Sequence, residues 1–326
     1  LADVAREAGV STSTASRVLR NRDLVHPETA RRVLKAMRDL SYSLDKTVSK
    51  NAISLVPVTL PYLSDPFFAM ILKGIADAAR IAETSVAYLD ADYSEQTQLE
   101  SLRQFAAGGA DSAIIAPVTS DPEFASSVQG LIENPVYVDR TPFGRAATAV
   151  VSDDTEGAYQ ATKYLLSLGH RRILYVGGEP NLTTEHNRLE GYKKALAEAH
   201  LPFSEELVHE HHFDQAMLRQ DHPESYLHHA DCTAVFAASD TIAGFVAREL
   251  RSAGRRIPED VSVLGYGDMP YSEHIGLTTV SSPAYEMGKN AFLLYQASVD
   301  RKALGRRSVV LRPSMVLRSS CGPPPA

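Results

Sequence analysis

The first twenty residues read LADVAREAGVSTSTASRVLR, numbered 1 to 20. Their apolar side chains form two stripes at helical spacing on either side of Gly9, namely Leu1, Val4, Ala5 and Ala8 before it and Ala15, Val18 and Leu19 after it. Gly9 can adopt the left-handed conformation that ends a helix, and Ser11 is a good N-cap for the next one. The stretch predicts two short helices joined by a tight glycine turn.

A third helix is predicted to follow directly. The segment Val25-His26-Pro27-Glu28-Thr29 places proline at the first helical position, which proline favours. The apolar residues that follow would face the same small core, and they are Ala30, Val33, Leu34 and Met37. The sequence therefore predicts an all-α mini-domain of three helices.

The outer face of the second helix suits a DNA major groove. Thr12, Ser13 and Ser16 are short enough to let the helix approach base edges, and Arg17 can donate two hydrogen bonds to guanine. Residues 1–50 carry ten Lys or Arg against six Asp or Glu, a net charge of +4, whereas the rest of the chain carries −11. A basic end on an acidic body indicates phosphate binding at that end. A small helical cap with a solvated face is the alternative interpretation.

The segments Asp3-Val4-Ala5-Arg6-Glu7-Ala8-Gly9-Val10-Ser11 and Ser16-Arg17-Val18-Leu19 resemble the headpiece of the LacI/GalR family of transcriptional regulators. This resemblance implies a helix-turn-helix in which Thr12, Ser13 and Arg17 read bases, while Ser11, Thr14 and Asn21 hold phosphates. The following hinge departs from the family pattern. Residues 43–51 read SLDKTVSKN, without the family's Pro and with Asn51 where a Leu that wedges into the minor groove is expected.

From Val56 onward, short apolar runs alternate with helix-length segments. The runs are Val56–Leu60, Ser85–Leu89, Ala113–Ala116, Val136–Val138, Ile173–Val176, Ala234–Ala237 and Val261–Leu264. Buried strands separated by helices indicate an α/β fold with two doubly wound parallel sheets. Ligands of such folds bind at the carboxyl ends of the strands.

The resemblance extends over most of the remaining chain, and it also includes periplasmic sugar-binding proteins. It rests on Ser64-Asp65-Pro66-Phe67-Phe68, Val138-Asp139-Arg140, Arg188-Leu189-Glu190-Gly191-Tyr192 and Pro258-Glu259-Asp260-Val261-Ser262-Val263. It implies a bilobal, periplasmic-binding-protein-like domain whose chain crosses between the lobes near Ser152, Ser282 and Leu311. The expected organisation is a headpiece at 1–43, a hinge or linker at 44–52, a bilobal effector-binding and dimerisation domain at 53–318 and a tail at 319–326. Its N-lobe would comprise about 53–152 and 283–311, and its C-lobe about 153–282 and 312–318.

The resemblance also implies an effector site between the lobes. Phe67 and Phe68 offer flat faces to a ring, and Asp139, Arg140 and Arg188 offer directional hydrogen bonds. The full expected set is Asp65, Phe67, Phe68, Asp139, Arg140, Arg188, Ser239, Asp268 and Ser282. In the alternative interpretation, the phenylalanines are core residues and the arginines form salt bridges.

Departures from the sugar-binding pattern bear on the ligand. Where related sugar binders carry Asn, Asn, Asp and Gln, this chain carries Asp65, Ser239, Gly267 and Ser282. These changes disfavour an ordinary hexose, because charge-assisted hydrogen bonds to ring hydroxyls are lost. A carbohydrate, a modified sugar, a nucleoside or another metabolite stays open as the effector, and so does a partner protein in place of one.

The sequence gives no indication of catalysis or of a cofactor. It contains no phosphate-binding glycine loop, no GxGxxG and no nucleophile elbow. Seven of the eleven histidines lie between His200 and His229, but without a metal-ligand spacing they favour a solvated surface, so no metal is expected. We expect a protein that is not an enzyme.

The expected function is sequence-specific transcriptional repression by a homodimer or tetramer bound to a near-palindromic double-stranded DNA operator. With two cysteines, no export signal at its first residues and no apolar run of membrane-spanning length, the chain is expected to be cytoplasmic and without a membrane partner. The alternative is a solute-binding protein or ligand sensor without DNA binding. Whether the effector releases or recruits DNA is left open.

Overall fold

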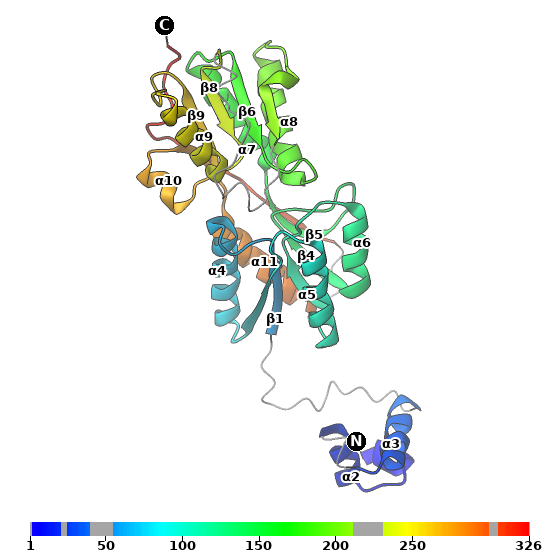
Figure 1. Cartoon of the computed structure of the whole chain (residues 1–326). Coiled ribbons are helices and arrows are strands. Elements are labelled where there is room, and N and C mark those ends of the chain that lie inside the picture. Colours follow the sequence, from blue (N-terminus) through cyan, green and yellow to red (C-terminus); the bar gives the residue numbers. More distant parts are fainter. Residues whose placement is uncertain (1, 21–24, 40–54, 211–230, 300–305, 326) are drawn as a thin grey trace. The chain divides into compact units, whose positions relative to one another are not determined.

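The computed structural model describes residues 2–20, 25–39, 55–210, 231–299 and 306–325. The chain divides into two compact units, Leu1–Ser54 and Leu55–Ala326 (Figure 1). Each unit has hydrophobic cores of its own. The hinge predicted at 44–52 lies outside the described residues.

The first unit contains the three predicted helices. They are α1 (Ala2–Glu7), α2 (Thr12–Arg20) and α3 (Pro27–Asp39). Gly9 lies between α1 and α2 with φ of +61°, a conformation that favours glycine. The core contains predicted apolar residues from each of the three helices, among them Val4, Ala15 and Val33. Helical spacing and one glycine turn are therefore enough to explain this unit.

The N-lobe of the second unit is built on a six-stranded parallel sheet in the order β11-β5-β4-β3-β1-β2. Its strands are β1 (Leu55–Leu60), β2 (Ser85–Asp90), β3 (Ser112–Ile115), β4 (Asn134–Val138), β5 (Thr148–Ser152) and β11 (Ser308–Leu311). The helices are α4 (Pro66–Ile81), α5 (Glu95–Ala107), α6 (Pro122–Leu131) and α11 (Ala284–Val299). Buried residues alternate between two cores, since Ile114 and Val136 pack with α4 and α11 whereas Ile115 and Tyr137 pack with α5 and α6.

The C-lobe is built on a second six-stranded sheet in the order β12-β10-β9-β8-β6-β7. Its strands are β6 (Ile173–Gly177), β7 (Val208–Glu210), β8 (Ala234–Ala237), β9 (Ser262–Gly267), β10 (Thr278–Ser281) and β12 (Ser314–Val316). Its helical elements are α7 (Asp154–Ser167), α8 (Thr183–Glu198), η3 (Glu205–Leu207), α9 (Asp240–Ser252) and α10 (Pro270–His274). Helices α7 and α8 pack against each other, and α9 packs on β8 and β9 (Figure 1).

The two predicted doubly wound sheets are confirmed with one correction. Strand β12 pairs antiparallel to β10, so the second sheet is not wholly parallel. The physical reason is the connection, because β10 leads from the C-lobe to the N-lobe and β12 enters the C-lobe again from the N-lobe, so the two strands run in opposite directions.

The lobes are joined where strands of one sheet lead into elements of the other. The chain passes from β5 to α7, from β10 to α11 and from β11 to β12. After β12, the last described residues stay on the C-lobe, where the Ser320 hydroxyl donates to the Val263 carbonyl and His170 hydrogen-bonds the Gly322 carbonyl. Within the described ranges, no helix has the length and apolar character needed to cross a membrane.

Candidate functional site

Helix α2 of the first unit presents the residues predicted to read DNA. The hydroxyl of Ser11 accepts a hydrogen bond from the Thr14 backbone N–H at 3.1 Å, so Ser11 caps the helix as predicted. Thr12, Ser13 and Arg17 are exposed on this helix. The Ser11 hydroxyl lies 2.8 Å from the hydroxyls of both Ser13 and Thr14. Asn21, predicted to hold a phosphate, lies outside the described residues.

The second unit contains an inter-lobe cleft, a cavity of about 80 Å³ at the carboxyl ends of the strands. Asp65, Phe67 and Phe68 follow β1 at the start of α4, while Asp139 and Arg140 follow β4. Arg188 enters from α8 and Ser239 from the start of α9. Seven of the nine predicted effector residues thus line one cavity, although more than 170 residues separate the first from the last.

Asp268 and Ser282 do not line this cavity. Asp268 has a φ of +57°, and its carboxylate pairs with Arg318 at 2.8 Å, away from the cleft. Its neighbours Gly267 and Met269 line the cavity instead. Ser282 is buried where the chain passes from β10 to α11, and its hydroxyl has no hydrogen-bond partner among the described residues. The predicted contacts from these two side chains are therefore not supported by their positions.

Arg188 is held by the C-lobe itself. Its Nε donates to Asp154 at 3.0 Å, and its Nη1 donates to the Ala238 carbonyl at 2.8 Å and lies 3.5 Å from Glu185. The guanidinium group also stacks 4.1 Å from the ring centroid of Tyr266. Burial opposes the charge of Arg188, but Asp154 and Glu185 outweigh it and raise the pKa of the guanidinium group. Arg188 therefore organises the floor of the cleft as a permanently charged group.

Asp139 and Arg140 form a second ion pair on the N-lobe side. The Arg140 Nε lies 3.1 Å from Asp139 Oδ2, and Arg140 Nη1 donates to the Pro117 carbonyl at 3.2 Å. Burial raises the pKa of Asp139 to about 6, against the opposing effect of Arg140. The Arg140 guanidinium lies 5.3 Å from the centroid of Phe68, which joins the ion pair to the aromatic wall.

Asp240 is a buried acceptor next to Ser239. It receives hydrogen bonds from the Met269 N–H at 2.8 Å and from the hydroxyls of Ser272 at 2.5 Å and Thr279 at 2.6 Å. Burial raises its pKa, while these hydrogen bonds lower it. Asp240 thereby ties α9 to the loop after β9, which shapes one wall of the cleft.

Sequence reasoning missed several residues that line the cleft. They are Tyr93, Val118, Glu179, Leu182, Thr184, Glu185, Asp240, Thr241, Tyr266 and Met269. Glu185 could have been found, because it lies three residues before Arg188 on one helix face. Tyr93 and Glu179 lie in loops that carry no periodic pattern, so only the fold brings them to the cleft.

A set of hydrogen bonds across the lobes, which we call the rim latch, closes one side of the cleft. It is formed by Ser120 and Thr141 of the N-lobe with Asn181 and Thr183 of the C-lobe. The Thr183 hydroxyl donates to the Thr141 carbonyl at 3.2 Å, and the Thr183 N–H donates to the Ser120 hydroxyl at 3.0 Å. The Ser120 N–H donates to the Asn181 carbonyl at 3.1 Å. The lobes are thus in contact around the cavity.

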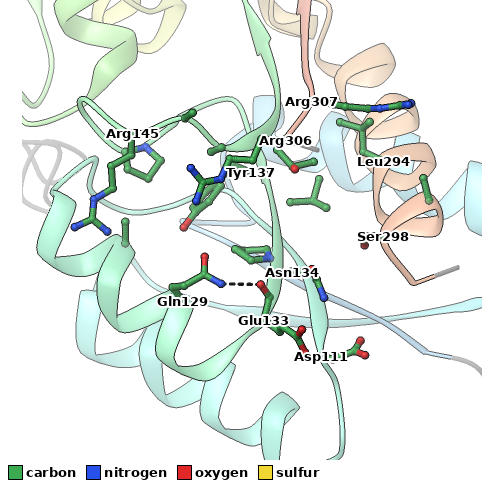
Figure 2. Close-up of a pocket in the computed structure, with 18 of the residues that line it drawn as sticks. Asp111, Gln129, Glu133, Asn134, Tyr137, Arg145, Leu294, Ser298, Arg306 and Arg307 are labelled. Atoms are coloured by element: carbon green, nitrogen blue, oxygen red, sulfur yellow. Dashed lines mark hydrogen bonds between the residues drawn. The ribbon is translucent and has the colours of Figure 1, made fainter. Parts of the chain in front are cut away.

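A larger hollow of about 1000 Å³ lies at the opposite edge of the N-lobe sheet, where β4 and β5 begin. Figure 2 shows Arg306 directed toward Tyr137 and Arg307 directed toward α11, as expected of neighbours in an extended segment. Arg145 and Arg306 are exposed, and Asp111 and Glu133 add carboxylates. Because its charged side chains are solvated rather than buried, this hollow is a weaker candidate than the smaller inter-lobe cleft.

Two parts of the chain match known protein families. Residues 1–44 match a family described as bacterial regulatory proteins, lacI family. Residues 162–321 match a periplasmic binding protein-like domain. The first match covers the helix-turn-helix, and the second covers most of the C-lobe and the final crossings between the lobes.

Relatives are similar over the whole length. The HTH-type transcriptional regulator DegA of Bacillus subtilis is 27% identical over 98% of this chain and 97% of its own length. The HTH-type transcriptional repressor PurR of Vibrio vulnificus is 28% identical over the same shares. Among solved structures, a complex of the transcriptional regulator CelR with cellobiose has a TM-score of 0.71 at 28% identity and covers 98% of both chains. An Enterococcus faecium regulator with bound ribose has a TM-score of 0.71 at 27% identity, over 83% of this chain and 99% of its own.

Proposed function

The chain belongs to the lacI family of bacterial regulatory proteins, and from this premise we propose that it is a sequence-specific DNA-binding transcriptional repressor controlled by a small molecule in the inter-lobe cleft. The observation that carries the proposal is the exposed polar face of α2. Thr12, Ser13 and Arg17 extend from a helix whose N-terminus is capped by Ser11. Such a face can enter a major groove, where short side chains and one arginine read bases.

We propose that the effector binds where the lobes meet. The support is the convergence of Asp65, Asp139, Arg140 and Arg188 on a cavity flanked by aromatic rings, together with relatives solved with cellobiose or ribose. A ligand in this position contacts both lobes and stabilises their closed arrangement. If the ligand binds that arrangement more tightly than the open one by about 3 kcal/mol, operator affinity changes by roughly 150-fold. Affinity rises if the closed arrangement is the one that binds DNA, and it falls if the open arrangement is.

The proposed active form is a homodimer. Two headpieces related by two-fold symmetry would bind the two halves of a near-palindromic operator. Exposed apolar residues on α4, namely Met70 and Ile81, are available for contact with a second copy. Light scattering that finds only monomers at micromolar concentration would remove this part of the proposal.

The first test is a fluorescence-anisotropy titration of the full chain against the DNA upstream of its own gene. Random competitor DNA is present, and two salt concentrations are used. We expect saturable binding that survives the competitor and weakens with salt, because phosphate contacts release counterions. Failure on that fragment and in a selection over genomic fragments would overturn DNA binding and leave a ligand sensor.

A further inference from the structure

The inter-lobe cleft carries more acid than base. Among the described residues that line it, five are carboxylates and two are guanidinium groups. The carboxylates are Asp65, Asp139, Glu179, Glu185 and Asp240, and a sixth, Asp154, lies behind Arg188. A ligand that enters this cavity meets a surplus of negative charge.

Both arginines are already paired with carboxylates of the protein, and Arg140 Nε has no hydrogen-bond partner among the described residues. Arg188 is already bound to Asp154, to the Ala238 carbonyl and, more loosely, to Glu185, and one face lies on Tyr266. Arg140 is paired with Asp139 and donates to the Pro117 carbonyl. A phosphate or carboxylate on the ligand would have to displace these contacts and would approach the remaining carboxylates.

Asp65 and Asp139 each have a carboxylate oxygen that can bind a positively charged group of the ligand. One oxygen of Asp65 accepts the Phe67 N–H at 2.9 Å, and the other accepts no hydrogen bond from the described residues. One oxygen of Asp139 faces Arg140, and its partner oxygen likewise accepts none from them. Burial raises the pKa of Asp65, Asp139, Glu185 and Asp240, because loss of water disfavours the charged carboxylate.

The size of the cavity limits the ligand further. About 80 Å³ is well below the roughly 300 to 1,000 Å³ of pockets for drug-sized ligands. Phe67 and Phe68 line this small space, and the rim latch joins the two lobes beside it. A molecule of monosaccharide size needs less widening of this cavity than a disaccharide does.

Resting on the proposed function, we propose that the effector is a compact polyhydroxylated molecule with a protonated amine, such as an amino sugar, and that the cleft rejects phosphorylated sugars. The amine binds between Asp65 and Asp139, where it compensates two buried carboxylates. The hydroxyl groups are held by the polar side chains of the C-lobe wall, which include Ser239 and Thr241.

The test is a calorimetric titration of the full chain with matched sets of monosaccharides. Each set comprises the neutral sugar, its 2-amino-2-deoxy derivative and its 6-phosphate, in the gluco, galacto and manno series. We expect an amino form to bind at least about tenfold more tightly than its neutral parent, and no phosphate to bind. A neutral sugar or phosphate that binds as tightly as its amino counterpart overturns the proposal. So does the absence of binding by all three amino sugars at millimolar concentration.

Asp65→Asn and Asp121→Asn form a matched pair of variants. Both aspartates precede a proline and cap a helix, α4 and α6 respectively, and asparagine is an equally good cap. We expect Asp65→Asn to reduce the preference for the amino form about tenfold, whereas Asp121→Asn, exposed and outside the cleft, leaves it unchanged. An unchanged preference in Asp65→Asn contradicts the assignment. Operator titrations without sugar report separately on DNA binding, so a failure of the proposed repressor function is distinguishable.

Discussion

Asp139 lies directly after β4, in a left-handed conformation with φ of +70°, and its carboxylate is buried. The charged groups that face it are Arg140, Asp154, Arg188 and Asp65. Its neighbours thus contribute two positive and two negative charges, and burial decides the outcome by raising the pKa to about 6. The folded protein therefore holds this proton at pH values where the unfolded chain has released it.

The pH dependence of stability follows from this difference. Because the pKa of Asp139 is higher in the folded state, its contribution favours folding below about pH 4 and is lost as the pH rises through about 6. Asp139→Asn does not titrate. We therefore expect the free energy of unfolding of the variant, relative to the parent, to increase by up to about 3 kcal/mol between pH 4 and pH 7. Urea denaturation at both pH values measures it, and a difference that stays constant or decreases contradicts the argument.

Arg17 is the long cation on the exposed face of α2. We expect Arg17→Ala to weaken specific operator binding by roughly 1 to 3 kcal/mol and to relax the preference at one base pair, because a bidentate contact with guanine is lost. Arg6→Ala on α1, where Arg6 pairs with Asp3 at the surface, is the comparison variant. Anisotropy titrations with single-base operator variants decide the matter, and an equal loss on specific and random DNA would identify Arg17 as a phosphate contact.

At the scale of elements, α4 and α11 cross at backbone contact. A Cβ atom built on Gly74 would lie 2.1 Å from the Tyr285 carbonyl oxygen, and one built on Gly288 would lie 2.0 Å from that of Ile71. Gly74→Ala should therefore destabilise the second unit by about 1 to 3 kcal/mol or more, because the obstacle is backbone. Gly130→Ala on α6 is the control, since nothing lies within 4 Å, and it should stabilise by up to about 1 kcal/mol. Thermal unfolding that ranks the two variants in the opposite order would refute this packing.

The Thr183 hydroxyl takes part in several hydrogen bonds of the rim latch. Thr183→Val keeps the shape of the side chain but removes its hydrogen bonds with Ser120 and Thr141. Without them, we expect the lobes to open in the free protein and effector affinity to fall roughly tenfold, because the binding-competent state is less populated. Small-angle scattering should show a larger radius of gyration. Thr97→Val, at the first turn of α5, is the control, and equal scattering curves for the two variants would show that the latch does not hold the lobes.

Strands with an apolar run of their own can be predicted from the sequence. Strands that are defined mainly by pairing with a neighbouring strand are missed. The seven apolar runs that were recognised all became strands, whereas β5, β7, β10, β11 and β12 were missed. Strands β11 and β12, with four and three residues, are only partly buried and have no run of their own. The residues of the cleft differ in the same way. Asp65 and Asp139 could be placed because they follow strands that the sequence predicts. The direction of the Asp268 side chain could not, because it depends on Arg318, fifty residues away.

For the whole molecule, the division into two units places the residues proposed to contact DNA and the cleft proposed to bind the effector in different units. Arg188→Ala leaves Asp154 and Glu185 buried without their shared cation. We expect this to destabilise the second unit by about 3 to 5 kcal/mol and to leave α1, α2 and α3 intact. Calorimetry should show only the transition of the second unit moving to lower temperature, and the surface pair variant Arg172→Ala should change it little. A headpiece transition that moves as well would show that the units unfold together.

The three passages between the lobes also limit how this protein can be rearranged by recombination. A headpiece can be exchanged with one junction ahead of Leu55, because the boundary between the two units falls there and the chain passes it once. A lobe cannot be exchanged in this way, since its segments are interrupted after β5, β10 and β11 and three junctions must match at once. Gene fusion at this boundary can therefore join a headpiece to a different sensor in a single event, whereas one lobe of the sensor cannot be replaced by a single fusion.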